Sequence, residues 1–120
     1  MTRKLIGAWG EDRAAAYLER KGYQIIAAGY RTRYGEIDLI AADTQFVAFV
    51  EVKTRKDAGF AEAREFVDQH KVVRIRQTAE MWLSAHECAL QPRFDVIEIY
   101  APQGVDTQGP KIVHLEDAFQ

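Results

Sequence analysis

The chain has 120 residues, of which 48% are hydrophobic and 28% charged, and its formal net charge is −2. This length allows about one domain with a real core, so we expect a single domain over residues 1–120. The single cysteine, Cys88, excludes an internal disulfide and favours a cytoplasmic location. Phe46–Val50, the longest apolar-leaning run, is far too short to span a bilayer, so no membrane association is expected.

The two parts of the chain differ in charge. Residues 1–76 contain 14 Lys/Arg and 11 Asp/Glu, whereas residues 77–120 contain 2 and 7. A slightly acidic chain is not typical of a strong nucleic-acid binder. Carboxylates that hold a divalent cation are neutralised, however. The basic first part therefore permits a polyanionic substrate without requiring one.

The N-terminal segment predicts a helix followed by a strand. Within Thr2–Lys21, apolar residues recur at steps of three and four, which is the helical spacing. Gly22 stands where a C-terminal cap belongs. Tyr23–Ala28 contains two adjacent β-branched residues after this stop signal and predicts a strand.

The next two segments predict a β-hairpin. Glu36–Ala42 and Phe46–Lys53 are separated only by the polar turn Asp43–Gln45. The second of these strands is apolar on both faces until its end. Such a strand belongs in the middle of a sheet that is covered on both sides.

The rest of the chain predicts a long helix and further strands. Asp68 is a suitable N-cap for a helix over Gln69–Glu87, and Pro92 marks a break after it. Phe94–Tyr100 predicts a strand, and Ile112–Leu115 a short edge strand. The expected fold class is therefore α/β, with the order α-β-β-β-α-β and a mixed sheet flanked by helices.

Three polar residues occupy positions where the strand pattern calls for apolar ones. Asp38 interrupts an apolar strand, and Glu51 and Lys53 end another. Because Glu51 and Lys53 are two residues apart on a strand, their side chains share a face. Asp38 and Glu51 are directly opposed across the hairpin if its loop is centred between Thr44 and Gln45. Opposed residues share a face, with Cβ atoms about 5 Å apart.

This arrangement suits a metal site for phosphodiester hydrolysis. Two close carboxylates with little solvent around them repel each other, and a divalent cation removes the repulsion. Hard oxygen ligands of this kind suit Mg²⁺ or Mn²⁺. Lys53 would orient the attacking water or neutralise the developing negative charge. The alternative is that Glu51 and Lys53 form an ordinary solvated salt bridge, worth less than about 1 kcal/mol.

Two motifs carry a resemblance to a known family. Gly35–Ala41 (GEIDLIA) and Phe49–Arg55 (FVEVKTR) resemble the YraN family of bacterial endonuclease-like proteins. That family is similar to the PD-(D/E)xK nuclease superfamily, which includes restriction enzymes and Holliday-junction resolvases. In this chain Ile37 replaces the proline for which the superfamily is named, and Gly29 stands where relatives often have an asparagine.

The resemblance implies a restriction-endonuclease-like core and a set of roles. Asp38 and Glu51 would be metal ligands and, with Lys53 as the catalytic lysine, the catalytic residues. Glu11 would match the first-helix carboxylate that resolvase-like members bring to the metal. A solvated helix glutamate is the open alternative for Glu11.

Basic and aromatic residues near these motifs are candidates for nucleic-acid contacts. A phosphate-binding role, which gives affinity without base specificity, is expected for Arg31, Arg33, Arg55 and Lys71. Tyr30 and Tyr34 alternate with two of these arginines, and either stacking on bases or packing in the core would explain them.

These observations lead to one main functional hypothesis and two alternatives. The main hypothesis is a Mg²⁺- or Mn²⁺-dependent endodeoxyribonuclease-like protein acting on branched or damaged DNA. The first alternative is a non-catalytic nucleic-acid-binding module that keeps the nuclease fold, and the second is a structural α/β domain. The resemblance to resolvases, which act as dimers, also implies a homodimer as an option.

Overall fold

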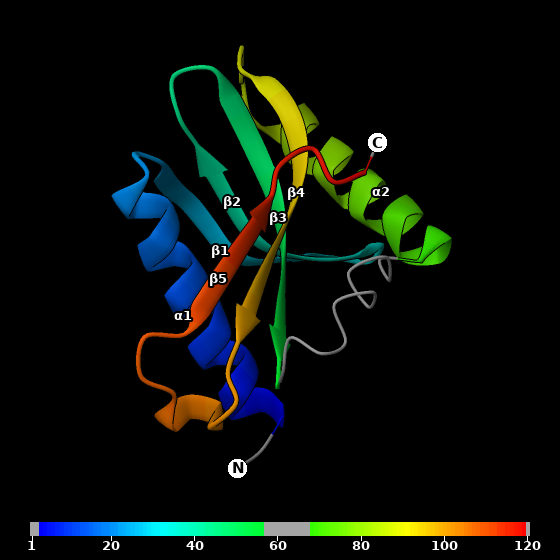
Figure 1. Ribbon diagram of the computed structural model, residues 1–120. Helices are drawn as coiled ribbons and strands as arrows, with labels where there is room; N and C mark the ends of the chain where they lie inside the picture. Colours follow the sequence, from blue (N-terminus) through cyan, green and yellow to red (C-terminus); the bar gives the residue numbers. More distant parts are fainter. Residues whose placement is uncertain (1–2, 57–67, 120) are drawn as a thin grey trace.

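A computed structural model describes residues 3–56 and 68–119 of the chain (Figure 1). In chain order the elements are α1 (Arg3–Arg20), β1 (Gln24–Thr32), β2 (Gly35–Ala42), β3 (Phe46–Arg55), α2 (Gln69–Ala85), β4 (Gln91–Tyr100), the 3-10 helix η2 (Gly104–Asp106) and β5 (Lys111–Leu115). The α/β class and the expected order α-β-β-β-α-β are confirmed. The edge strand expected near the C-terminus is present as β5.

The strands of the described residues form one five-stranded mixed sheet in the order β1-β2-β3-β4-β5. Only β3 and β4 run parallel; the other neighbours are antiparallel. The expected hairpin is the β2–β3 pair. The chain between the parallel strands β3 and β4 includes α2, as a parallel pair requires a crossover connection.

The sheet lies between the two helices, and each helix covers one face (Figure 1). On the α1 side, Leu18 packs into a buried cluster with Leu39 and Val50. On the α2 side, Trp82 packs into a second cluster with Phe49. Since neighbouring residues of β3 are divided between the two clusters, β3 is buried on both faces, as predicted from its composition.

β1 is longer than the predicted strand Tyr23–Ala28 and continues to Thr32. Within this extension Tyr30 pairs with Ile37 of β2. Gly29 has a φ of +66°, in the left-handed region that glycine and asparagine tolerate best. The backbone here explains why an asparagine is a reasonable substitute for Gly29.

Two other boundaries also differ from the prediction. Pro92 was expected to break the chain, but it lies within β4 and is paired with Val47 of β3. On the other side of β4, β5 pairs only with Val96–Tyr100, so β4 is an edge strand at Pro92 and loses no ladder hydrogen bond there. The helix expected over Gln69–Glu87 ends at Ala85.

The β2–β3 pairing ends part-way along β2. The paired residues run from Ala42 and Val47 to Leu39 and Val50. Before Leu39, β2 remains paired with β1 alone. The two central strands therefore diverge at Asp38 and Glu51, where the sheet opens into a fork.

Candidate metal site and nucleic-acid cleft

Asp38 and Glu51 lie together at this fork. The β2–β3 register is centred between Thr44 and Gln45, as the prediction of opposed carboxylates required. Just past the last paired residues, the main-chain N–H of Val52 donates to Asp38 Oδ2 at 2.8 Å. The Asp38 side chain thus continues the contact between the strands where their backbones separate, and this holds its carboxyl group beside Glu51.

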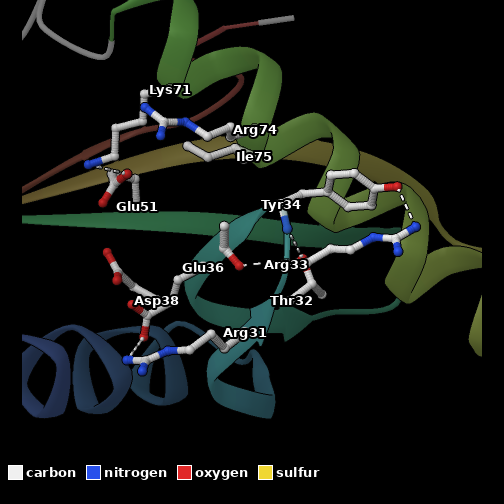
Figure 2. A pocket seen from close by; sticks show the side chains of 11 residues that line it. Arg31, Thr32, Arg33, Tyr34, Glu36, Asp38, Glu51, Lys71, Arg74 and Ile75 are labelled. Carbon is white, nitrogen blue, oxygen red and sulfur yellow. Dashed lines mark hydrogen bonds and ion pairs between the residues drawn. The ribbon is translucent and has the colours of Figure 1, made fainter.

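The two carboxylates line a cavity of about 640 Å³ (Figure 2). One wall is the connection between β1 and β2, and the opposite wall is the N-terminal half of α2. Cationic and aromatic side chains line these walls: Arg31, Arg33, Tyr34, Lys71 and Arg74. The cavity therefore has carboxylates at its floor and cationic side chains along its walls.

Asp38 is buried beside Glu51, and this environment shifts its pKa. Burial, a hydrogen bond with Glu51 and the negative charge of Glu51 together raise the pKa of Asp38 to about 8. Glu51 itself is buried, with only 9% of its surface exposed. Without a cation, Asp38 is therefore expected to hold a proton near neutral pH.

A lysine from α2 contributes directly to this pair. Lys71 Nζ lies 2.9 Å from Glu51 Oε2. Burial lowers the pKa of Lys71, but the charge of Glu51, the hydrogen bond with it and the charge of Asp38 act against burial, and the pKa is raised overall. Asp68 caps the helix by accepting a hydrogen bond from the Lys71 N–H at 2.9 Å, as predicted for the N-cap. From the sequence, Lys71 was expected only at a phosphate. Its position four residues before the buried Ile75 was a signal that it faces the sheet.

Lys53 lies beside the same charges. Burial, followed by the positive charge of Lys71, lowers the pKa of Lys53, while Glu51 opposes this shift. Two ammonium groups and two carboxylates therefore meet where β3 passes under the start of α2. This is a larger charge cluster than the three residues singled out in the sequence.

Glu11 approaches the cluster because α1 crosses β3 closely. At Gly10 an added Cβ would overlap the Thr54 hydroxyl, so a larger residue here would require the Thr54 side chain or the helix to shift. Burial raises the pKa of Glu11, and the carboxylates of Glu36, Asp12 and Glu51 raise it further. Glu11 thus interacts electrostatically with the acid pair.

The carboxylate pair fits a hard divalent cation. In the described part of the chain, no three His, Cys, Asp or Glu side chains form a group suited to hold a metal. Asp38 and Glu51, which lie together at the fork, would be protein ligands, and the role of Glu11 as a further ligand stays a prediction. Two carboxylates suffice for Mg²⁺, which keeps several waters and substrate oxygens as its other ligands. Burial and the charge of Glu51 raise the pKa of Asp38, and a bound cation would offset both effects.

The remaining predicted residues fall into two groups. Arg31, which is paired with Glu36 at 3.4 Å, and Arg33 lie at the cavity. Arg55 does not line it, because its guanidinium lies 3.3 Å from the buried Glu98. Tyr30 packs against the α2-side core, which leaves Tyr34 as the tyrosine of this pair at the cavity.

Comparison with known proteins gives the family. A model of the "Uncharacterised protein family UPF0102" matches residues 10–99. The chain belongs to this family. UPF0102 proteins from Nocardia farcinica and Rhodococcus opacus are 43% and 45% identical to it, covering 98% and 95% of this chain and 91% and 95% of their own lengths. A UPF0102 protein from Caldanaerobacter subterraneus is 40% identical over 99% of this chain and 98% of its own.

The UPF0102 match includes Glu11, Asp38, Glu51, Lys53 and Lys71, so the whole charge cluster lies in the matched region. Family membership, expected from the YraN resemblance, is thereby confirmed. The names of the family and of these relatives give no activity, so the nuclease character stays a prediction. Neither α1 nor α2, the α-helices of the described residues, has the length and apolar character of a membrane span.

Proposed function

We propose that this UPF0102 protein is a Mg²⁺- or Mn²⁺-dependent endonuclease that hydrolyses DNA phosphodiester bonds, with branched or damaged DNA as its substrate. The observation that carries the proposal is the position of Asp38 and Glu51, which meet at the base of a cavity with cationic walls. A purely structural domain has no evident need for a buried acid pair. Such a pair is costly unless a positive charge neutralises it.

Each charged residue of the cluster has a role in this proposal. Asp38 and Glu51 would hold the cation, and the Val52 N–H keeps Asp38 oriented. When bound, the cation supplies a Lewis acid for phosphodiester hydrolysis. Lys53 Nζ, on the face of Glu51, would orient the attacking water or neutralise charge that develops on the phosphate.

The walls would hold the DNA backbone. Arg31, Arg33 and Arg74 come from two elements on opposite sides of the cavity, so a strand between them meets positive charge on both sides (Figure 2). Contacts of this kind fix the position of a phosphate without reading the base sequence. The proposal therefore favours recognition of DNA shape over recognition of sequence.

The test is cleavage of a panel of DNA shapes in the presence of Mn²⁺. We expect wild type to cut at least one branched, nicked or single-stranded DNA, and Lys53→Ala to reduce the rate by about 100-fold or more. Mn²⁺ should raise the melting temperature of wild type but not that of Asp38→Ala or Glu51→Ala. Arg20→Ala, at an exposed position in the last turn of α1, is the control and should behave like wild type.

Two outcomes would contradict the proposal. A thermal response to Mn²⁺ with DNA binding but no cleavage of any shape would favour a non-catalytic binding module. Absence of both DNA binding at low salt and any effect of Mn²⁺ would favour a structural domain.

A further inference from the structure

The acid pair Asp38 and Glu51 lines the cavity. Glu51 is 9% exposed, and the sheet fork that holds Asp38 opens between the β1–β2 connection and α2. A phosphate that enters the cavity therefore passes between two protein walls to reach the carboxylates. Those walls come from opposite sides of the fork, as Figure 2 shows.

The cavity is of a size that accommodates a small ligand. Its volume of about 640 Å³ lies inside the range of 300–1,000 Å³ that is usual for small-molecule sites. A duplex is much larger, since its major groove alone is about 12 Å wide. Enzymes that act on a group inside a duplex must first take the nucleotide out of the stack. The cavity therefore has room for the nucleotides of one strand rather than for a whole duplex.

An aromatic ring lies on one wall, next to the cations. The Arg33 guanidinium lies 5.0 Å from the centre of the Tyr34 ring and donates a hydrogen bond to the Tyr34 hydroxyl at 3.0 Å. Lys71 and Arg74 lie on the opposite wall. A positively charged groove combined with a ring on which bases can stack is the usual design of sites for single-stranded nucleic acid.

We infer that the cavity is a binding site for a single, unpaired DNA strand, with a base stacked on Tyr34 and its backbone held by Arg74. The inference rests on the proposed function and makes it more specific. The substrate class is DNA with an unpaired segment, such as a single-stranded arm. We expect continuous duplex to bind at this cavity more weakly.

The test is binding to three DNAs that carry the same labelled strand: the strand alone, its blunt duplex, and a duplex with a single-stranded arm. Fluorescence anisotropy is measured with Mn²⁺ in the Lys53→Ala protein, in which cleavage is expected to be slow. We expect the strand alone and the armed duplex to bind at least about tenfold more tightly than the blunt duplex at the same salt concentration. Blunt duplex that binds as tightly as the single strand would overturn the inference.

Matched variants locate the binding site. Tyr34→Leu should weaken single-strand binding by about tenfold, while Tyr34→Phe keeps the ring and should bind like the parent protein. Arg74→Ala should lower the slope of log affinity against log salt by about 0.7, the effect of one phosphate contact. Arg76→Ala, on the same helix but outside the cavity lining, should not change the slope. Equal effects of the two arginine variants would contradict the inference even if Tyr34→Leu failed to fold.

The two levels of the proposal can fail separately. Cleavage that depends on Asp38 but proceeds equally on blunt duplex would leave the nuclease proposal intact and overturn the single-strand inference. Absence of binding to all three DNAs would reject both.

Discussion

Asp38 combines a structural contact with an unfavourable charge. Its Oδ2 accepts the Val52 N–H where the strands diverge, and the same carboxyl group faces Glu51. An asparagine would keep an oxygen acceptor for Val52 and remove the repulsion. Asp38 therefore lowers the stability of the fold relative to an uncharged residue of the same shape. A loss of stability in exchange for activity is typical of functional positions.

Asp38→Asn should separate stability from metal binding. The pKa of Asp38 is raised from 3.8 to about 8, so between these pH values the folded state binds more protons than the unfolded state. Without metal, the free energy of unfolding of wild type should therefore fall as pH rises from about 4 to about 8. Asp38→Asn should lack this fall and be more stable than wild type at pH 8, by about 1 kcal/mol or more. Urea unfolding in EDTA measures both quantities.

The same variant should lose the rise in melting temperature with Mn²⁺. Asp106→Asn, at an exposed acid of η2, is the control and should retain both the pH dependence and the metal response of wild type. An Asp38→Asn protein that is less stable than wild type at pH 8 in EDTA would show that the acid pair is not under repulsion.

At this scale the sequence predicted the acid pair but not the full cluster. The opposition of Asp38 and Glu51 follows from strand alternation and the centre of one short loop, which are both local. The contact between Lys71 and Glu51 depends on how α2 packs across the sheet, and no local pattern determines that. The choice between stacking and packing for Tyr30 and Tyr34 was open for the same reason.

The contact between α1 and β3 depends on a missing side chain. Gly10 lies where the helix crosses the strand, and a Cβ there would overlap the Thr54 hydroxyl. Glycine is otherwise unfavourable inside a helix, by about 1 kcal/mol relative to alanine. The close approach explains its presence and also brings Glu11 toward the acid pair.

The effect of Gly10→Ala on stability should therefore depend on the residue at position 54. In wild type the new methyl group meets Thr54, and we expect a loss of about 1–3 kcal/mol in the free energy of unfolding. In Thr54→Ala, which removes the hydroxyl, the same substitution should be neutral or stabilising by up to about 1 kcal/mol, because only the gain in helix propensity remains. A double-mutant cycle by urea denaturation measures this coupling. Equal effects in both backgrounds would show that helix and strand are not in contact at Gly10.

At the scale of elements the sequence was a reliable guide wherever the signal was local. Local patterns predicted the N-cap at Asp68, the β2–β3 hairpin and the burial of β3 on both faces. The extension of β1 through Gly29 was not, because its pairing with β2 compensates for a residue with poor strand propensity. Pro92 lies inside β4 because β5 is short, and the length of β5 cannot be inferred from the residues around Pro92.

At the scale of the whole molecule, a buried polar network joins distant parts of the chain on the α1-covered face. Asp95 of β4 is fully buried; it accepts hydrogen bonds from Arg93 at 2.8 and 2.9 Å, from the Asp117 N–H at 3.0 Å, and lies 2.7 Å from His114 Nε2. Arg93 also contacts Tyr23, just after α1. One carboxylate thus connects β4, β5 and the C-terminal segment. The sequence analysis predicted the strand but not this network, because Arg93 and His114 come together only through the packing of β4 and β5 in the sheet.

Asp95→Asn should weaken the whole fold without affecting the cleft on the other face. An amide cannot accept from all these donors, and breaking a buried charged network typically costs about 3–5 kcal/mol. Although burial acts against it, hydrogen bonds from His114 and Arg93 lower the pKa of Asp95. The stabilisation that the Asp95 carboxylate gives to the folded state is therefore complete above pH 3.8, the ordinary pKa of aspartate. It is lost as pH falls through the lowered pKa. Urea unfolding from pH 7 to pH 3 should show that the difference in free energy of unfolding between wild type and Asp95→Asn becomes smaller only at the acid end.

Glu80→Gln, at an exposed acid of α2, is the control and should match wild type throughout. The rise in melting temperature with Mn²⁺ should be the same in Asp95→Asn as in wild type, and its loss would show that the two faces of the sheet are coupled.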